Sequence, residues 1–286
     1  MMSTPTLTSS LVLYHNQPEA FEQAMRCFLD GAEGGLLFVI DNSKAPIVSP
    51  LFVHPRVRYQ FVGRNVGFGA GHNLALKAIG EAGFALPLAH LFLNPDVVFD
   101  TRALPTLLAE LEADPTIGAL MPRIVFPDGE LQRLCKLLPT PVDLLLRRFL
   151  PLPPLVHALN RRYELHDLPQ DGKLEVPSLS GCFLMVRHAL LRAVGGFDER
   201  YFMYMEDVDL VRRIGDHART VYVPSVSVTH GYAKGSYRDK RLLSYHLRSA
   251  RLYFDKWGWW FDRARRDRNQ RILRALATAQ HPGMES

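Results

Sequence analysis

The sequence contains few cysteines and no long apolar segment. Cys27, Cys135 and Cys182 lie far apart, without the close spacing of metal ligands, so we interpret them as reduced packing residues. No uninterrupted apolar run approaches the roughly 18 residues that a membrane-spanning helix needs. The N-terminal residues MMSTPTLTSS also lack the basic and then apolar segments of a secretory signal. We therefore expect the chain to stay in the cytoplasm.

The common phosphate-binding motifs are also missing. Gly67, Gly69 and Gly71 have the spacing G-x-G-x-G rather than G-x-G-x-x-G, and no P-loop lysine follows them. The sequence therefore supports neither a dinucleotide-binding fold nor a Walker-type ATPase. These glycines nevertheless precede a predicted helix, where free N–H groups favour anions and the absence of side chains permits close approach of a ligand.

Strand-like and helical segments alternate through the first half of the chain. The 286 residues, 47% hydrophobic and 22% charged, are typical of a soluble globular protein with one large domain or two small ones. Apolar runs such as 35–40 and 88–93 alternate with helical patterns over 18–29, 70–82 and 101–112. This alternation predicts an α/β fold, with a mostly parallel central sheet flanked by helices.

The second half is less regular. Residues 127–175 are rich in proline and basic residues, and we interpret them as an insertion. Strand character returns in 176–186, and a pair of strands is predicted within 220–230. A long helix is predicted from Arg241 to Lys256, followed by a basic, aromatic C-terminal extension that we also expect to be helical.

The chain is basic, with a net charge of +5 and a pI near 9.2. Such a charge suits nucleic acid, an anionic membrane or a phosphorylated ligand. Basic residues gather in 131–163 and 256–274 beside leucine, proline and tryptophan, a composition typical of a membrane interface; a docked helix with a solvated basic face is the alternative. We expect no nucleic-acid binding, because no groove-reading helix motif accompanies the charge. Residues 131–163 contain a single acid, Asp143, and six basic residues: Arg133, Lys136, Arg147, Arg148, Arg161 and Arg162.

Polar residues follow four of the predicted strands or lie in the turns after them. They are Tyr14, His15 and Asn16, then Asp41, then the segment around Gly67, then Asn94, Pro95 and Asp96. Each alone could be a turn, since asparagine, proline and aspartate favour turns. In open α/β sheets, however, ligands bind at the carboxyl ends of the strands. Together the four predict a cleft for a nucleoside diphosphate.

Two further sites lie in the second half. Glu206 and Asp207 follow the apolar segment YFMYM, and apolar surroundings can raise the pKa of a carboxylate and turn it into a general base. An acidic helix start is otherwise a complement to the helix dipole, which we expect to explain Asp209. His230 ends the run VSVTH and is either a structural histidine or a metal ligand.

The order of these motifs resembles a known family. LVLYHN, IDNS, NVGFGAGHNLAL, LNPDV, GCFLMVRHALLRAVGGFDERYFMYMEDVDL and VTHGYAKGS together are similar to the family-2 inverting glycosyltransferases of GT-A fold, especially the bacterial rhamnosyltransferase-like members. The resemblance covers about residues 8–256. It implies a nucleotide-sugar-binding half (1–126), the insertion (127–175), an acceptor and catalytic half (176–240), a closing helix (241–256) and an extension (257–286).

The resemblance also implies roles for the site residues. Tyr14 and Asp41 would hold the nucleotide base, and Asn65 and Gly67 would approach the nucleoside. Asp96 would bind a divalent metal, Mg²⁺ or Mn²⁺, on the donor diphosphate. Here the family's D-x-D motif is Asn94-Pro95-Asp96, with one acid, so His230 becomes a plausible second ligand.

On the acceptor side, Asp207 would be the catalytic base and Glu206 its acceptor-orienting neighbour. The processive-synthase motif Q-x-x-R-W is absent, which favours adding one sugar per encounter.

The expected function is therefore transfer of a sugar to a saccharide acceptor in lipopolysaccharide, O-antigen or related polysaccharide synthesis. The favoured donor is dTDP-L-rhamnose, and the favoured acceptor is lipid-linked, at the cytoplasmic surface of the inner membrane. A UDP-hexose transferase of the same family is the first alternative. A non-catalytic sugar-nucleotide or glycan-binding module is the second.

Overall fold

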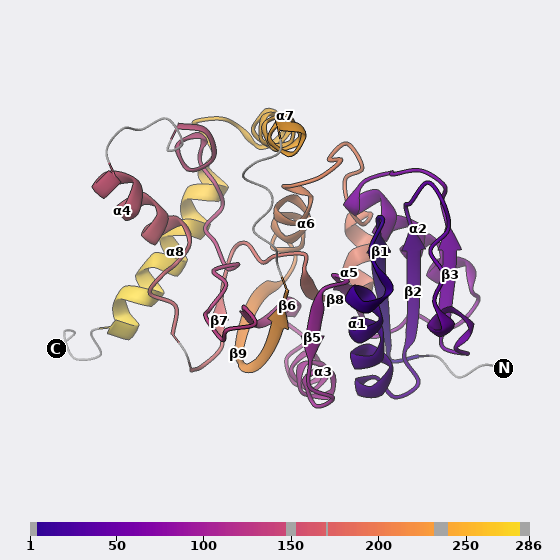
Figure 1. The fold of residues 1–286 in the computed structure, drawn as a ribbon. Coiled ribbons are helices and arrows are strands. Elements are labelled where there is room, and N and C mark those ends of the chain that lie inside the picture. The colour runs from indigo at the N-terminus through magenta and orange to yellow at the C-terminus, as the bar shows by residue number, and fades with distance from the viewer. Residues whose placement is uncertain (1–4, 147–152, 170, 232–239, 281–286) are drawn as a thin grey trace.

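A nine-stranded mixed sheet lies at the centre of the fold (Figure 1). The computed structural model describes residues 5–146, 153–169, 171–231 and 240–280, so Arg147 and Arg148 lie outside the described residues. The strand order is β3-β2-β1-β4-β8-β6-β9-β5, with β7 paired to β9. The strands are β1 (Leu7–Leu13), β2 (Leu36–Asp41), β3 (Val57–Phe61), β4 (Ala89–Leu93), β5 (Val97–Phe99), β6 (Ile117–Val125), β7 (Leu174–Glu175), β8 (Phe183–Arg187) and β9 (Arg219–His230).

Helices cover both faces of this sheet. α1 and α3 pack together on one face, and α2, α5 and α6 pack on the other. The helices are α1 (Pro18–Gly31), α2 (Phe68–Glu81), α3 (Ala103–Ala113), α4 (Pro153–Tyr163), α5 (His188–Val194), α6 (Glu206–Ile214), α7 (Lys240–Trp257) and α8 (Arg263–Gln280), with short helical turns at Pro50–Val53 and Val142–Leu146. The predicted α/β class, with helices on both faces of a mostly parallel sheet, is confirmed.

The parallel half of the sheet brings the predicted strand ends to one edge. β1 pairs in parallel with β2 and β4, and β2 pairs in parallel with β3. Leu13 lies opposite Asp41, and Asp41 lies opposite Phe61, so these three strands end in register. All five residues of β4 are buried, as expected for a strand covered on both faces.

Several predicted boundaries were wrong. The expected strand pair in 220–230 is one long strand, β9, whose register against β6 shifts between Val223 and Ser227. Pro224 lies in this irregularity, where a ladder donor is not needed. The helix expected to follow the glycines begins at Phe68, so Gly69 and Gly71 lie inside its first turn. An added Cβ on Gly71 would come within 2.9 Å of Val12, which shows how closely α2 packs on β1.

The C-terminal helix α8 is part of the folded body. Ile272 and Leu276 are buried in the main hydrophobic core. The Asn269 side chain donates to the Leu138 carbonyl at 2.8 Å and accepts from the Leu138 N–H at 2.9 Å, which ties α8 to the insertion. In Figure 1, α8 and α4 both lie on the side of the molecule away from β3.

α7 packs on the loop that leads into α6. Tyr201 and Met205 of this loop form a buried cluster with Ala250, Tyr253 and Phe254 of α7. Figure 1 shows α7 near α6, at the edge of the molecule where β1 ends. No helix in the described part of the chain is long and apolar enough to cross a membrane.

Candidate active site

Asp41, at the end of β2, orders the loop that follows it. Its Oδ1 accepts from the Ser43 N–H at 2.9 Å, and its Oδ2 accepts from the Ile47 N–H at 2.8 Å and from the Tyr59 hydroxyl at 2.7 Å. Burial opposes ionisation, but these hydrogen bonds outweigh it and lower the pKa of the Asp41 carboxyl. Asp41 is fully buried, so it would meet a nucleotide base only through its remaining acceptor capacity.

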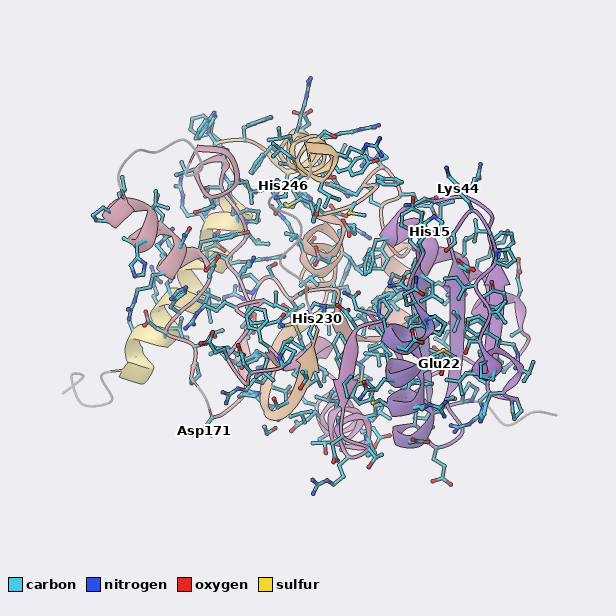
Figure 2. The ribbon with its side chains drawn as sticks, in the orientation of Figure 1. His15, Glu22, Lys44, Asp171, His230 and His246 are labelled. Atoms are coloured by element: carbon cyan, nitrogen blue, oxygen red, sulfur yellow. The ribbon has the colours of Figure 1, made fainter. Side chains whose placement is uncertain are left out.

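Tyr14 lies next to this loop and has an accessible ring. Its side chain is about half exposed and lies edge-on to the His15 ring, with ring centroids 4.5 Å apart. His15 has a left-handed backbone (φ 55°), and its N–H donates to Ser43 Oγ at 2.8 Å. The segments at the ends of β1 and β2, which carry Tyr14 and Asp41, are therefore joined by a hydrogen bond. Figure 2 shows His15 in the upper part of the molecule, where β1 ends.

Gly67 sits where the backbone needs a glycine. Its φ of 94° is left-handed, and a Cβ there would collide with the Phe202 carbonyl oxygen. Asn65 Oδ1 accepts from the Gly67 N–H at 2.9 Å, which caps this turn before α2. The segment thus contacts the loop before α6, although sequence alone placed it only on the donor side.

Asp96 and His230 meet at the edge shared by β5 and β9. His230 Nε2 lies 3.2 Å from Asp96 Oδ1, and the Asn94 side-chain nitrogen lies 3.4 Å from the same ring atom. The histidine is buried, whereas the Asp96 side chain is about one-third exposed. Figure 2 shows His230 near the middle of the molecule.

Gln132 fixes the orientation of the His230 ring. The Gln132 side-chain nitrogen donates to the His230 carbonyl at 2.8 Å, which leaves its Oε1 to accept from Nδ1 of the ring at 2.9 Å. With the proton on Nδ1, a neutral ring presents the lone pair of Nε2 towards the Asp96 carboxylate. Two acceptors that face each other suit a bound cation, and an outer partner on the other ring nitrogen is typical of a metal-binding histidine.

A short backbone segment joins this pair to Asp207. The Asn94 N–H donates to the Cys182 carbonyl at 2.8 Å, and the Gly181 N–H donates to Asp207 Oδ2 at 3.0 Å. Burial raises the pKa of the Cys182 thiol to about 12, and the charges of Asp207 and Asp96 contribute to this rise. Both carboxylates therefore lie near the start of β8.

Glu206 and Asp207 form the first turn of α6. Burial raises the pKa of the Asp207 carboxyl, although N–H groups of Gly181 and Val208 and the charge of Lys136 act in the opposite direction. Burial and the adjacent Asp207 raise the pKa of Glu206 well above its usual range. Glu206 Oε2 is buried and has no hydrogen-bond partner within the described residues.

The loop before these acids is strained. Tyr204 and Met205 both have left-handed backbones, with φ of 69° and 67°, which non-glycine residues rarely adopt. Met205 packs in the α7 cluster, and the Met203 carbonyl accepts from Ser249 Oγ at 2.8 Å. Packing by α7 thus holds the strained turn that presents Asp207.

The structure brings most of the predicted residues into two neighbouring groups. Asn94, Asp96 and His230 form one, and Glu206 and Asp207 form the other. Sequence reasoning missed Gln132 and Lys136, because both come from the insertion and neither carries a motif. Asp209 is structural: its buried carboxylate binds Arg213, Lys256 and Trp257.

Two known proteins are similar in sequence to this chain over most of its length. The chain is 36% identical over 221 residues to the N-acetylglucosaminyl-diphospho-decaprenol L-rhamnosyltransferase of Mycobacterium tuberculosis, covering 72% of this chain and 70% of that protein. It belongs to this rhamnosyltransferase family of glycosyltransferases. A second family member, rhamnosyltransferase WbbL of Escherichia coli, is 25% identical over 250 residues, which cover 85% of this chain and 90% of WbbL. No family model matches the chain.

Solved structures of other proteins confirm the GT-A fold of this chain. GalNAc-T7 with UDP, GalNAc and Mn²⁺ superimposes with a TM-score of 0.60 at 13% identity, over 98% of this chain and 59% of that one. Staphylococcus aureus TarS (residues 1–349) gives a TM-score of 0.59 at 14% identity, over 96% of this chain and 72% of that one. At such low identity, the likeness concerns the fold.

Proposed function

We propose that this glycosyltransferase moves L-rhamnose from dTDP-L-rhamnose to a lipid-linked saccharide acceptor, with inversion at the anomeric carbon. The observation that carries the proposal is the arrangement of two carboxylates at the start of β8. Asp96 lies beside His230, and Asp207 accepts a hydrogen bond from the Gly181 N–H. The names of the rhamnosyltransferase relatives support the sugar.

Asp96 and His230 would hold a divalent metal, Mg²⁺ or Mn²⁺. Among the residues that the structure describes, no group of three or more His, Cys, Asp and Glu side chains is arranged to hold a metal. Two protein ligands leave coordination positions for diphosphate oxygens and water, as is usual for Mg²⁺ at phosphates. Such a metal would supply positive charge that stabilises a departing diphosphate. Asn94 and Gln132 contact the His230 ring and would hold it in position.

Asp207 would accept the proton of the attacking acceptor hydroxyl. Its raised pKa brings it closer to that of an effective base at neutral pH, while its two backbone hydrogen bonds fix its direction. Burial and the neighbouring Asp207 raise the pKa of Glu206, which favours its protonated form, and in that form Glu206 would donate a hydrogen bond to the acceptor. A base without a covalent nucleophile gives one in-line displacement, and hence inversion.

An aromatic tip would hold the chain on the cytoplasmic surface of the inner membrane. Trp260 is 58% exposed and Phe261 is 95% exposed, in the turn between α7 and α8. Arg248 and Arg251 are exposed on the preceding helix α7, near exposed Leu247. Aromatic side chains bordered by arginine suit an anionic bilayer surface. α7 also packs on the loop before Asp207, so this edge would bring a lipid-linked acceptor near the base.

Nucleotide release from a donor panel tests the proposal. The panel contains dTDP-L-rhamnose, UDP-glucose, UDP-galactose, UDP-N-acetylglucosamine and GDP-mannose, with Mg²⁺ or Mn²⁺ and then with chelator, and bacterial lipopolysaccharide or a lipid-linked sugar as acceptor. We expect metal-dependent release from dTDP-L-rhamnose. Release from a UDP-sugar instead would favour the hexosyltransferase alternative. Nucleotide binding without release from any donor would favour the non-catalytic module.

A further inference from the structure

Phe202 lies where the donor side of the site meets the loop that leads to Asp207. Its carbonyl accepts from the N–H of Phe68, the first residue of α2, at 3.1 Å. A Cβ added to Gly67 would come within 3.1 Å of Cδ2 of the Phe202 ring. The backbone and the ring of Phe202 therefore both pack against the turn before α2. The same loop continues directly into the first turn of α6, which carries Asp207.

The Phe202 ring is supported by α7 and stays partly exposed. Tyr245 of α7 packs against it, with ring centroids 4.8 Å apart and ring planes inclined at 46°. Both side chains are partly exposed. Because neither ring is fully buried, the pair leaves apolar surface for a bound molecule at this position.

Phe68 extends this aromatic surface towards the catalytic base. A Cβ added to Gly181 would lie 3.2 Å from Cε1 of Phe68 and 3.3 Å from the Cβ of Asp207. The Gly181 N–H also donates to Asp207 Oδ2 at 3.0 Å. Aromatic side chains therefore extend from the turn before α2 to the backbone that holds Asp207.

The reacting sugar has to lie near this surface. In the proposed in-line displacement, the anomeric carbon lies between the diphosphate at Asp96 and the hydroxyl that approaches Asp207. The segment from Tyr201 to Met205, YFMYM, carries no charged or amide side chain to bind a sugar hydroxyl. An aromatic ring provides a large apolar surface for a methyl group, whereas a hydroxyl buried against it without a hydrogen-bond partner costs free energy.

We infer that Phe202 binds the C6 methyl group of L-rhamnose and selects this 6-deoxy sugar over the corresponding hexose. This inference rests on the proposed function, in which the donor is dTDP-L-rhamnose. L-Rhamnose is 6-deoxy-L-mannose, so the two sugars differ by one hydroxyl group at C6. An apolar contact distinguishes such a pair by up to about 100-fold. Tyr245 is the positioning residue that holds the Phe202 ring against the sugar.

Two donors that differ only in this hydroxyl test the inference. Calorimetry in the presence of Mg²⁺ compares dTDP-L-rhamnose, dTDP-L-mannose and dTDP. We expect the wild type to bind the rhamnose donor at least about tenfold more tightly than the mannose donor. Phe202→Ser should reduce this preference to under about threefold, with the affinity for dTDP unchanged. Phe202→Leu keeps an apolar side chain and should retain most of the preference.

Variants of α7 test the same contact without changing the loop. Tyr245→Ala should lower the preference, whereas Tyr245→Phe keeps the ring and should retain it. Phe84→Ser changes another partly buried phenylalanine, one that packs with Ile79 in a separate apolar cluster, and serves as the matched control. Wild-type affinity for dTDP shows that a variant is folded.

Equal affinity of the wild type for the two sugar nucleotides would overturn the inference, even if rhamnose is transferred. An unchanged preference in Phe202→Ser would also overturn it. So would an equal loss of affinity for dTDP and for both sugar nucleotides, because the ring would then contact the nucleotide. Failure of the proposed function gives a different result: the wild type would bind dTDP weakly and a UDP-sugar tightly, which would refute the donor and the inference with it.

Discussion

His230 Nε2 lies 3.2 Å from Asp96 Oδ1, and Gln132 holds the opposite nitrogen of the same ring at 2.9 Å. The pair comes from strand ends that are distant in sequence, and it has the form of a half-built metal site. A cation beside the ring would reconcile the approach of its lone pair to a carboxylate oxygen.

His230→Ala should therefore raise the metal concentration needed for half-maximal activity. Gln132→Leu should have a smaller effect in the same direction, within the range of about 10–100-fold that loss of an outer partner costs in metal affinity. Titration of activity with Mn²⁺ and Mg²⁺ measures both. His217→Gln changes an exposed histidine away from the site and is the control. An unchanged metal titration in His230→Ala would remove His230 from the metal site.

Stability should fall as the pH drops below about 6.5. Burial lowers the pKa of His72 to about 3 and that of His90 well below its usual value, and burial also lowers the pKa of His188. Between the folded and unfolded pKa values, the unfolded chain binds more protons, so each group costs up to about 1.4 kcal/mol per pH unit. Stability is thus fully present above about pH 6.5 and is lost towards pH 3.

Urea unfolding between pH 8 and 5 measures this slope. Both ring nitrogens of His188 lack hydrogen-bond partners within the described residues, so His188→Leu should flatten the slope with little loss at pH 8. The exposed His217→Gln should keep the wild-type slope. Equal slopes in all three proteins would show that His188 has no part in the acid sensitivity.

The buried pair Arg212–Asp262 should stabilise the fold by anchoring the turn that leads into α8. Both side chains are only 3% exposed, and Arg212 also lies 4.1 Å from the Trp257 ring centroid. Asp262→Asn leaves the arginine charge buried, which should cost about 3–5 kcal/mol of unfolding free energy. Asp267→Asn breaks an exposed pair with Arg263 and should cost under about 1 kcal/mol. Similar unfolding midpoints for the two variants would contradict this account.

Membrane binding should depend on the aromatic tip rather than on α8 as a whole. Trp260→Ser with Phe261→Ser should lower sedimentation with anionic vesicles severalfold, because two exposed apolar anchors are lost. Val53 is 88% exposed on the donor half, so Val53→Ser is the matched control. Point variants are required because deletion of residues 257–286 would remove core residues as well. Unchanged sedimentation of the double variant would exclude this tip as the anchor.

Sequence patterns predicted the sheet and its polar edge because both follow from local rules. Buried parallel strands give continuous apolar runs, and Asp41 and Asp96 interrupt those runs at their carboxyl ends. Gln132 and Lys136 could not be found in this way, since they act through contacts made by an irregular insertion. The C-terminal helix was predicted, but the burial of α8 against the core was not, for another reason. Its buried surface includes the polar residues Arg265 and Asn269, whose hydrogen-bond partners include the distant Pro139 and Leu138 carbonyls.

The most direct test of the account is Asp207→Asn, measured for sugar transfer and for donor binding in the same preparation. The substitution removes the base but keeps the size of the side chain at the start of α6. We predict a fall of about 10²–10⁴-fold in the transfer rate, with the dissociation constant for dTDP-L-rhamnose nearly unchanged. Transfer within a few-fold of wild type would contradict the account, because another group would then have to accept the proton.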